Sequence, residues 1–140
     1  MFQKVAKFVY LWLPPLLMCG VIFYLSSLSN LKLGEGTPEF IRRKLVHLLE
    51  YGFLAILFYR ALEGKVEVRL KDFMQSRQFW VALIFTSLFA LSDEIHQTFV
   101  PTREGKIYDL TFDAIGVFLG LCLLNLSHRF VKQKILKWKE

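Results

Sequence analysis

Ionisable side chains interrupt three of the apolar stretches in this chain, and their types and spacing predict chemistry. The first group is Lys44, His47, Glu50 and Tyr51, whose spacings of three, three or four, and seven residues place them on one helix face. A histidine with a carboxylate one turn along can act as a general base or nucleophile. We therefore predict His47 and Glu50 as catalytic residues, with Lys44 and Tyr51 as substrate contacts. A histidine that only hydrogen-bonds a neighbour is the simpler alternative for His47.

A second group lies near the end of a later apolar stretch. It contains Ser92, Asp93, Glu94 and Gln97, with Asp93 and Gln97 four residues apart and Glu94 and Gln97 three apart. Both spacings join neighbours on a helix surface. We predict Asp93 and Glu94 as catalytic residues and Ser92 and Gln97 as substrate contacts.

A third group opens the last apolar stretch, where Asp109 and Asp113 are four residues apart. Arg103 precedes it in a short loop that also contains Pro101, so it is expected to overhang the other groups. A guanidinium can clamp a phosphate with two parallel hydrogen bonds, and Lys44 can add a point charge. Arg103, Asp109 and Asp113 are predicted substrate contacts.

Acidic side chains outnumber basic ones in these groups, since five acids face Lys44, Arg103 and Lys106. An acidic excess in a confined site requires a proton, a metal ion or a cationic ligand. Mg²⁺ is the cofactor that such carboxylates suit best, and no other cofactor is predicted. Its predicted ligands are Asp93, Glu94, Asp109 and Asp113. A self-satisfied network of ion pairs is the alternative.

Membrane-spanning helices are the elements that must position these groups. Of the 140 residues, 54% are hydrophobic and 14 are Phe, which exceeds what a soluble core of this size needs. A span requires about 20 mostly apolar residues. Four stretches qualify: residues 8–28, 45–62, 79–100 and 107–126. The sequence therefore predicts an all-α integral membrane bundle of about four transmembrane helices, forming a single domain over residues 1–140.

The basic residues predict how the bundle lies in the membrane. The net charge of +6 is no nucleic-acid signature, because Lys and Arg lie between apolar stretches, where topology signals and anchors belong. They are more numerous on the side of the termini, which predicts both termini in the cytoplasm. The basic tail, residues 127–140, is predicted either to bind anionic lipid or to be solvated. At about 1.5 Å rise per residue, Glu50, Asp93 and Asp113 all lie about 10 Å below the outer face.

Three ordered motifs resemble the VanZ-like family, named for a small membrane protein associated with teicoplanin resistance. They are K-x-x-H-x-x-x-Y at 44–51, S-D-E-x-x-Q-x-F-x-P-x-R at 92–103, and D-x-x-x-D-x-x-G-x-x-x-G at 109–120. The resemblance covers the motif-bearing part, residues 44–120, and implies a multi-span membrane protein with a polar cluster. The family usually has Asn at the position of Asp113, so this site is one charge more acidic.

These observations predict a site at the outer leaflet that binds or modifies a phosphate-bearing lipid head group, of a phospholipid or a polyprenyl phosphate. Any enzymatic activity is expected to be that of a lipid-phosphate hydrolase or transferase, and the resemblance links it to envelope metabolism or antibiotic resistance. The alternative is a non-catalytic binding or resistance protein for a glycopeptide or wall precursor. A proton path is less favoured, because the inner halves of the spans are apolar. The predicted partners are membrane lipids and no nucleic acid. A homodimer is a further predicted possibility, because Gly116 and Gly120 permit close contact between helices.

Overall fold

The computed structural model describes residues 2–28, 37–64, 73–101, 103 and 108–137, and only the backbone of residues 37–40 and 128–137. These residues form α1 (Phe2–Ser27), α2 (Thr37–Glu63), the 3-10 turn η1 (Phe73–Gln75), α3 (Arg77–Gln97) and α4 (Asp109–Lys137). Each α-helix contains a segment long and apolar enough to cross a membrane. The predicted all-α bundle of four spanning helices is confirmed.

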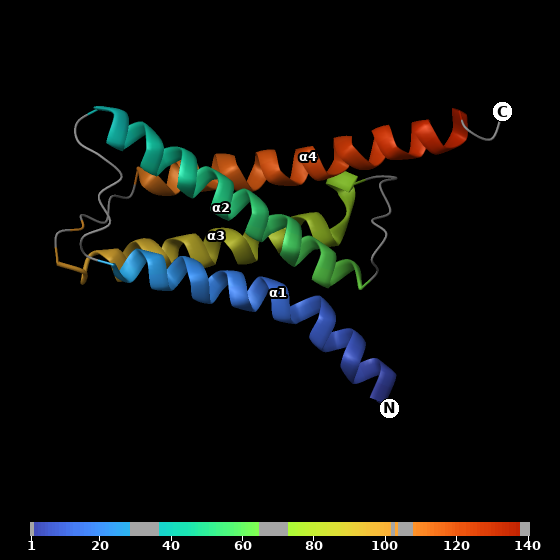
Figure 1. Cartoon of the computed structure of the whole chain (residues 1–140), viewed down its shortest axis with the longest axis horizontal. Helices are drawn as coiled ribbons and strands as arrows, with labels where there is room; N and C mark the ends of the chain where they lie inside the picture. The colour runs from blue at the N-terminus through green and yellow to red at the C-terminus, as the bar shows by residue number, and fades with distance from the viewer. Residues whose placement is uncertain (1, 29–36, 65–72, 102, 104–107, 138–140) are drawn as a thin grey trace.

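The helices alternate in direction along the bundle. The C-terminal ends of α1 and α3 meet the N-terminal ends of α2 and α4 at one end, on the left in Figure 1, and both chain termini lie toward the other end. The ionisable residues of 44–51, 92–97 and 109–113 all lie in the half of the bundle where α2 and α4 begin. The alternation therefore brings distant parts of the chain to one end of the bundle.

The helix α2 is the centre of the bundle, since it packs against α1, α3 and α4. Its closest partner is α4, which crosses it at glycines. A Cβ atom added at Gly52 would lie 2.8 Å from the carbonyl oxygen of Gly116, and one added at Gly120 would clash with the backbone of Gly52. The small-residue face of α4 is thus covered by α2 of the same chain, and the homodimer stays a prediction.

The helix bounds differ from the predicted spans, and three of these differences have a physical reason. The basic turn of residues 42–44 is helical, so α2 begins at Thr37 rather than near residue 45. The helix α3 ends at Gln97, where Phe99 and Val100 donate to carbonyls three residues earlier and Pro101 has no N–H to continue the ladder. The helix α4 extends ten residues past Ser127, because a helix can continue beyond the apolar segment that spans the membrane. The side chains of the basic tail lie outside the described residues.

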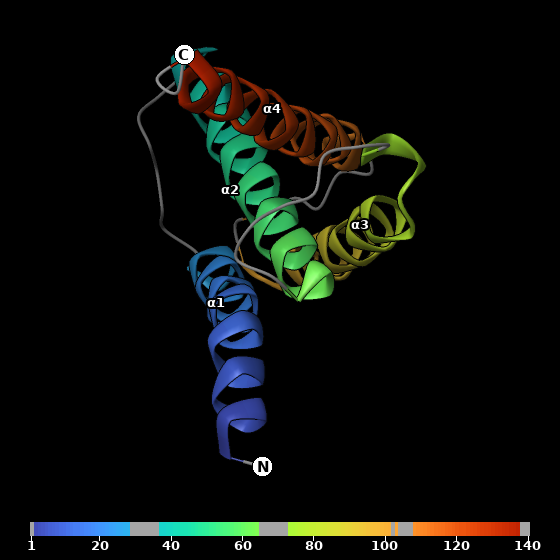
Figure 2. The ribbon, with the colours of Figure 1, turned by 90° about the vertical axis from the view of Figure 1, so that its right-hand side faces the viewer.

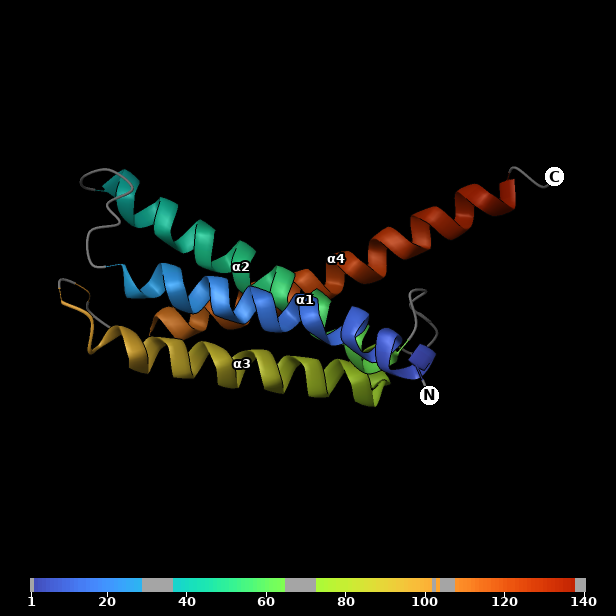
Figure 3. The same cartoon turned by 60° about the horizontal axis from the view of Figure 1, so that its bottom comes forward.

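The first helix is the one least covered by the rest of the bundle (Figures 2 and 3). It remains helical through Pro14 and Pro15, and its N-terminal part turns away from the other helices. Its C-terminal end is different, because Ile22 and Ser26 are buried there. Cys19 and Cys122 are free thiols, and both are partly buried. α1 therefore contributes to the site only through its last turns.

Candidate functional site

Asp93 lies at the centre of a buried hydrogen-bonded cluster. Its carboxylate oxygen Oδ2 accepts hydrogen bonds from Ser26 (2.7 Å), Tyr51 (3.0 Å) and Gln97 (2.9 Å). The donors come from α1, α2 and α3, and Asp93 is 0% exposed. Hydrogen bonds to an ionised acceptor are stronger than those between neutral groups. The cluster therefore joins three helices at one point, and Asp93 acts as its acceptor.

The other predicted residues of α3 lie around this cluster. Glu94 is buried, at 5% exposure. Ser92 is exposed and donates to the Phe89 carbonyl of its own helix, which places it outside the cluster. His96, which the sequence analysis did not single out, stacks on Phe23 with 4.0 Å between ring centroids and lies 2.9 Å from Ser27. These contacts fasten α3 to α1 beside the cluster.

Two contacts between ionisable side chains connect the N-terminal half of α2 with the first two turns of α4. The Lys44 ammonium pairs with Asp109 and lies over the rings of Tyr108 and Phe112. One turn deeper, His47 Nδ1 lies 3.3 Å from Asp113 Oδ1. Lys44 is therefore directed toward α4, where it neutralises a carboxylate. Of the predicted phosphate-binding cations, only Arg103 lines the cavity described below.

The carboxylates predicted to bind Mg²⁺ are distributed among different partners. Asp93 belongs to the buried cluster, Asp109 pairs with Lys44, and Asp113 faces His47. Among the described residues, no group of three or more His, Cys, Asp or Glu side chains is placed to share a metal ion. The Mg²⁺ site stays a prediction.

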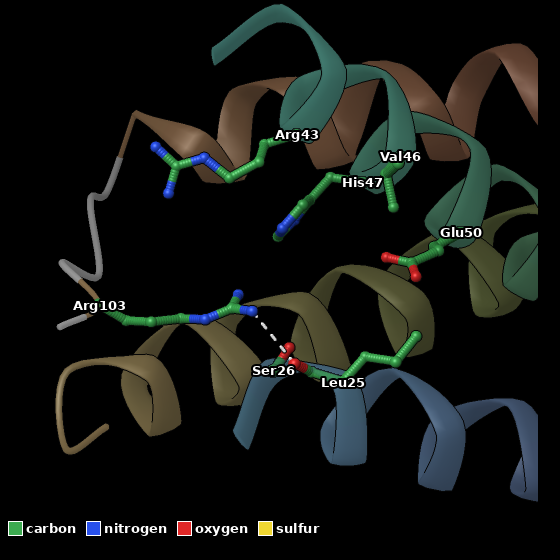
Figure 4. Close-up of a pocket in the computed structure, with 7 residues that line it drawn as sticks. All are labelled: Leu25, Ser26, Arg43, Val46, His47, Glu50 and Arg103. Atoms are coloured by element: carbon green, nitrogen blue, oxygen red, sulfur yellow. Dashed lines mark hydrogen bonds between the residues drawn. The ribbon is translucent and has the colours of Figure 1, made fainter. Parts of the chain in front are cut away.

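A cavity of about 50 Å³ lies between α1 and α2. Residues from α1, α2 and the segment after α3 line it: Leu25, Ser26, Arg43, Val46, His47, Glu50 and Arg103. A site for one water needs roughly 10–15 Å³, so the cavity holds only a few water molecules or one small polar group. Figure 4 shows His47 and Glu50 projecting into this space from α2.

Two guanidinium groups flank one end of the cavity, away from Glu50. Arg43 reaches along it from α2, and Arg103 reaches in from the segment after α3 (Figure 4). Arg103 donates from Nε to the Leu28 carbonyl (3.3 Å) and from a terminal nitrogen to the Leu25 carbonyl (3.1 Å). Burial, and then the positive charge of Arg43, lower the pKa of the Arg103 guanidinium. The positive charges of the two guanidiniums add at this end of the cavity and favour the binding of an anion there.

Glu50 is the acidic group of the cavity. It is partly buried, lines the wall beside His47, and has no hydrogen-bond partner among the residues that the structure describes. Tyr51, the next residue in the sequence, is fully buried, and its hydroxyl group donates a hydrogen bond to Asp93. Adjacent residues on α2 thus have different roles, because one faces the cavity and the other faces the core.

Sequence reasoning missed Arg43 and gave Ser26 no role. Arg43, His47 and Glu50 are spaced by four and three residues, so helical periodicity alone could have placed Arg43 on the His47 face. No pattern in the sequence pairs Ser26 with Asp93. Lys106, which the sequence places among the basic residues of the site, lies outside the described residues.

A family model comparison supplies the relationship to known proteins. The VanZ/LLP1 family model matches residues 9–128 of the 140. The chain belongs to the VanZ/LLP1 family. The match is longer than the motif-bearing part, because it includes most of α1. Membership and the four apolar helices make this chain a VanZ/LLP1 membrane protein. Neither the curated proteins nor the solved structures compared with the chain give a match.

Proposed function

We propose that this VanZ/LLP1 protein binds the phosphate of a membrane lipid head group, of a phospholipid or a polyprenyl phosphate, at the cavity between α1 and α2. The observation that carries the proposal is the pair of guanidiniums, Arg43 and Arg103, at the end of that cavity away from Glu50. Guanidinium donors match the oxygens of a phosphate. Among the described residues neither arginine forms an ion pair with a carboxylate.

The size and place of the cavity favour a lipid phosphate over a larger ligand. The volume of about 50 Å³ admits a small polar group, so a glycopeptide or wall precursor would reach only the rim. Leu25 and Val46 supply apolar wall beside the polar residues, and both belong to helices that span the membrane. A lipid can therefore place its phosphate at the arginines while its chains stay in the bilayer.

His47 and Glu50 are the candidate acid–base groups of this site. Both project into the cavity behind the arginines, where a bound head group would meet them. A base in reach of a water molecule or hydroxyl group is what a lipid-phosphate hydrolase or transferase requires. Asp93 has a different role in this proposal, because its oxygen Oδ2 accepts from three donors on three helices and so positions those helices.

The membrane orientation is part of the proposal. Basic residues are more numerous on the side of the termini, which favours that side as cytoplasmic and directs the cavity to the outer leaflet. The basic tail is proposed to rest on anionic lipid of the inner leaflet.

Thermal stabilisation by defined lipids tests the proposal. The delipidated full-length protein is mixed with phosphatidic acid or undecaprenyl phosphate, or with diacylglycerol of the same acyl chains as the phosphatidic acid. Phosphate-bearing lipids should raise the unfolding temperature and diacylglycerol should not, because a ligand stabilises only the state that binds it. Ser92→Ala, which changes an exposed hydroxyl away from the cavity, should respond like the wild type. Equal stabilisation by both kinds of lipid, or none, would contradict the proposal.

Turnover of the bound lipid separates catalysis from plain binding. If His47 is a base, His47→Gln should abolish product formation and leave the stabilisation by lipid nearly intact. A wild-type protein that binds phosphate-bearing lipid and forms no product would identify a binding protein and reject the hydrolase or transferase.

A further inference from the structure

Three buried polar atoms of one facing pair, His47 on α2 and Asp113 on α4, have no hydrogen-bond partner among the described residues. They are His47 Nδ1 and the two carboxylate oxygens of Asp113, a residue that is 1% exposed. An unpaired polar group away from water costs free energy. His47 Nδ1 and Asp113 Oδ1 lie 3.3 Å apart, just beyond the usual N–H···O range of about 2.7–3.2 Å. Each atom is therefore the nearest available partner of the other.

We infer that Asp113 is a positioning residue for His47, which accepts the Nδ1 hydrogen and leaves Nε2 free toward the cavity. The two nitrogens of a neutral imidazole differ, and a bond made by one fixes the role of the other. Asp113 belongs to α4, which packs on α2, whereas the residues that line the cavity with His47 come from α1, α2 and the segment after α3. A carboxylate behind a histidine holds the ring and its tautomer for proton transfer.

This inference rests on the proposed function for its chemical use. With Nδ1–H bonded to Asp113, Nε2 carries the lone pair that faces a bound head group. A proton can then pass from a water molecule or lipid hydroxyl group to Nε2, and the resulting imidazolium is balanced by the Asp113 carboxylate. The oxygen that has lost its proton bonds to the lipid phosphorus while the phosphorus–oxygen bond to the leaving group breaks, and Nε2 gives its proton to the leaving oxygen. Asp113 itself contacts neither lipid nor water in this scheme, which differs from its predicted role as a substrate contact or metal ligand.

The neighbouring aspartate on α4 provides a matched control. Asp109 lies one turn before Asp113, and its carboxylate pairs with Lys44 instead of a histidine. Asp109→Asn removes a charge from the same helix end and leaves the His47 contact in place. Asp113→Asn keeps an oxygen that can accept from Nδ1, whereas Asp113→Leu removes every acceptor.

Nitrogen NMR of the histidine rings tests the inference without any lipid substrate. The full-length protein is labelled with ¹⁵N-histidine, and the His47 signals are identified by their loss in His47→Gln. The pH is raised until the ring signals stop changing, so that neutral tautomers are compared. The wild type, Asp109→Asn and Asp113→Asn should all show the Nδ1–H tautomer at His47, and Asp113→Leu should lose this preference.

An Nε2–H tautomer in the wild type, or an unchanged signal in Asp113→Leu, would overturn the inference. Should Asp113→Leu fail to fold, the wild-type tautomer still decides. Failure of the proposed function is seen separately, as the absence of lipid stabilisation in a wild type whose His47 tautomer is as expected.

Discussion

Ser26 on α1 donates a 2.7 Å hydrogen bond to Asp93 on α3, and both side chains are buried. The donor belongs to the helix that is least covered by the rest of the bundle, and the acceptor belongs to the sequence motif at residues 92–103. Gln97 also donates to Ser26, at 3.3 Å. The last turn of α1 is therefore part of the polar cluster. These hydrogen bonds also hold Ser26 in place, and Ser26 lines the cavity.

Replacing Asp93 should destabilise the whole bundle. Asp93→Ala leaves donors of α1, α2 and α3 without their acceptor, at a cost of about 1–3 kcal/mol for each donor left unsatisfied. The unfolding temperature in detergent should fall by at least about 5 °C. Asp93→Asn, which keeps one acceptor oxygen, should have a smaller effect, and Ser92→Ala should have almost none. Similar stability of Asp93→Ala and Ser92→Ala would show that the cluster does not hold the helices.

The glycine crossing of α2 and α4 should not tolerate a methyl group. A Cβ at Gly116 would lie 2.8 Å from the Cα atom of Leu48, whereas one at Gly20 meets nothing within 4 Å. Overpacking of this kind costs about 1–3 kcal/mol. Gly52→Ala and Gly116→Ala should lower the unfolding temperature, and Gly20→Ala should leave it unchanged. A tolerant Gly116 would mean that the two helices are farther apart than described.

The neighbouring cations Arg43 and Lys44 should have opposite phenotypes. Lys44 pairs with Asp109, so Lys44→Met should lower stability and retain the response to phosphate-bearing lipid. Arg43 lines the cavity, so Arg43→Met should keep its stability and lose much of that response. Both effects are measured in one thermal titration with phosphatidic acid. The reverse result would place the phosphate on the α4 side of α2.

Cysteine accessibility tests the membrane orientation. Pro101 and Gln75 are exposed residues at opposite ends of the bundle. In a background with Cys19→Ala and Cys122→Ala, Pro101→Cys should react with an impermeant reagent added to intact cells, and Gln75→Cys should react only after permeabilisation. Labelling in the opposite order would place the cavity at the inner leaflet.

The number and type of helices could be predicted from the sequence, because a span needs about 20 apolar residues whatever its neighbours are. The depth of the polar residues along their helices could also be predicted, because helical rise alone brings Glu50, Asp93 and Asp113 to similar levels. The structure agrees with this for Asp93 and Asp113, which contact the α2 residues Tyr51 and His47.

The direction in which each side chain points could not be predicted. Lys44 and Arg43 differ by one residue, and only the packing of α2 against α4 decides which of them faces the cavity. That packing depends on Gly52, which no motif identified, meeting Gly116 and Gly120. The partner of Asp93 on α1 was hidden for a similar reason, since Ser26 is one of several serines near the end of an apolar stretch.

The central claim is that Arg43 and Arg103 bind a lipid phosphate, and a comparison of dissociation constants tests it most directly. Native mass spectrometry of the full-length protein would measure the affinities for phosphatidic acid and for diacylglycerol of the same acyl chains. The wild type and Lys44→Met should prefer phosphatidic acid by at least about tenfold, or about 1.4 kcal/mol. The double variant Arg43→Met, Arg103→Met should bind both lipids equally. Equal affinities in the wild type, or a preference that survives in the double variant, would contradict the account.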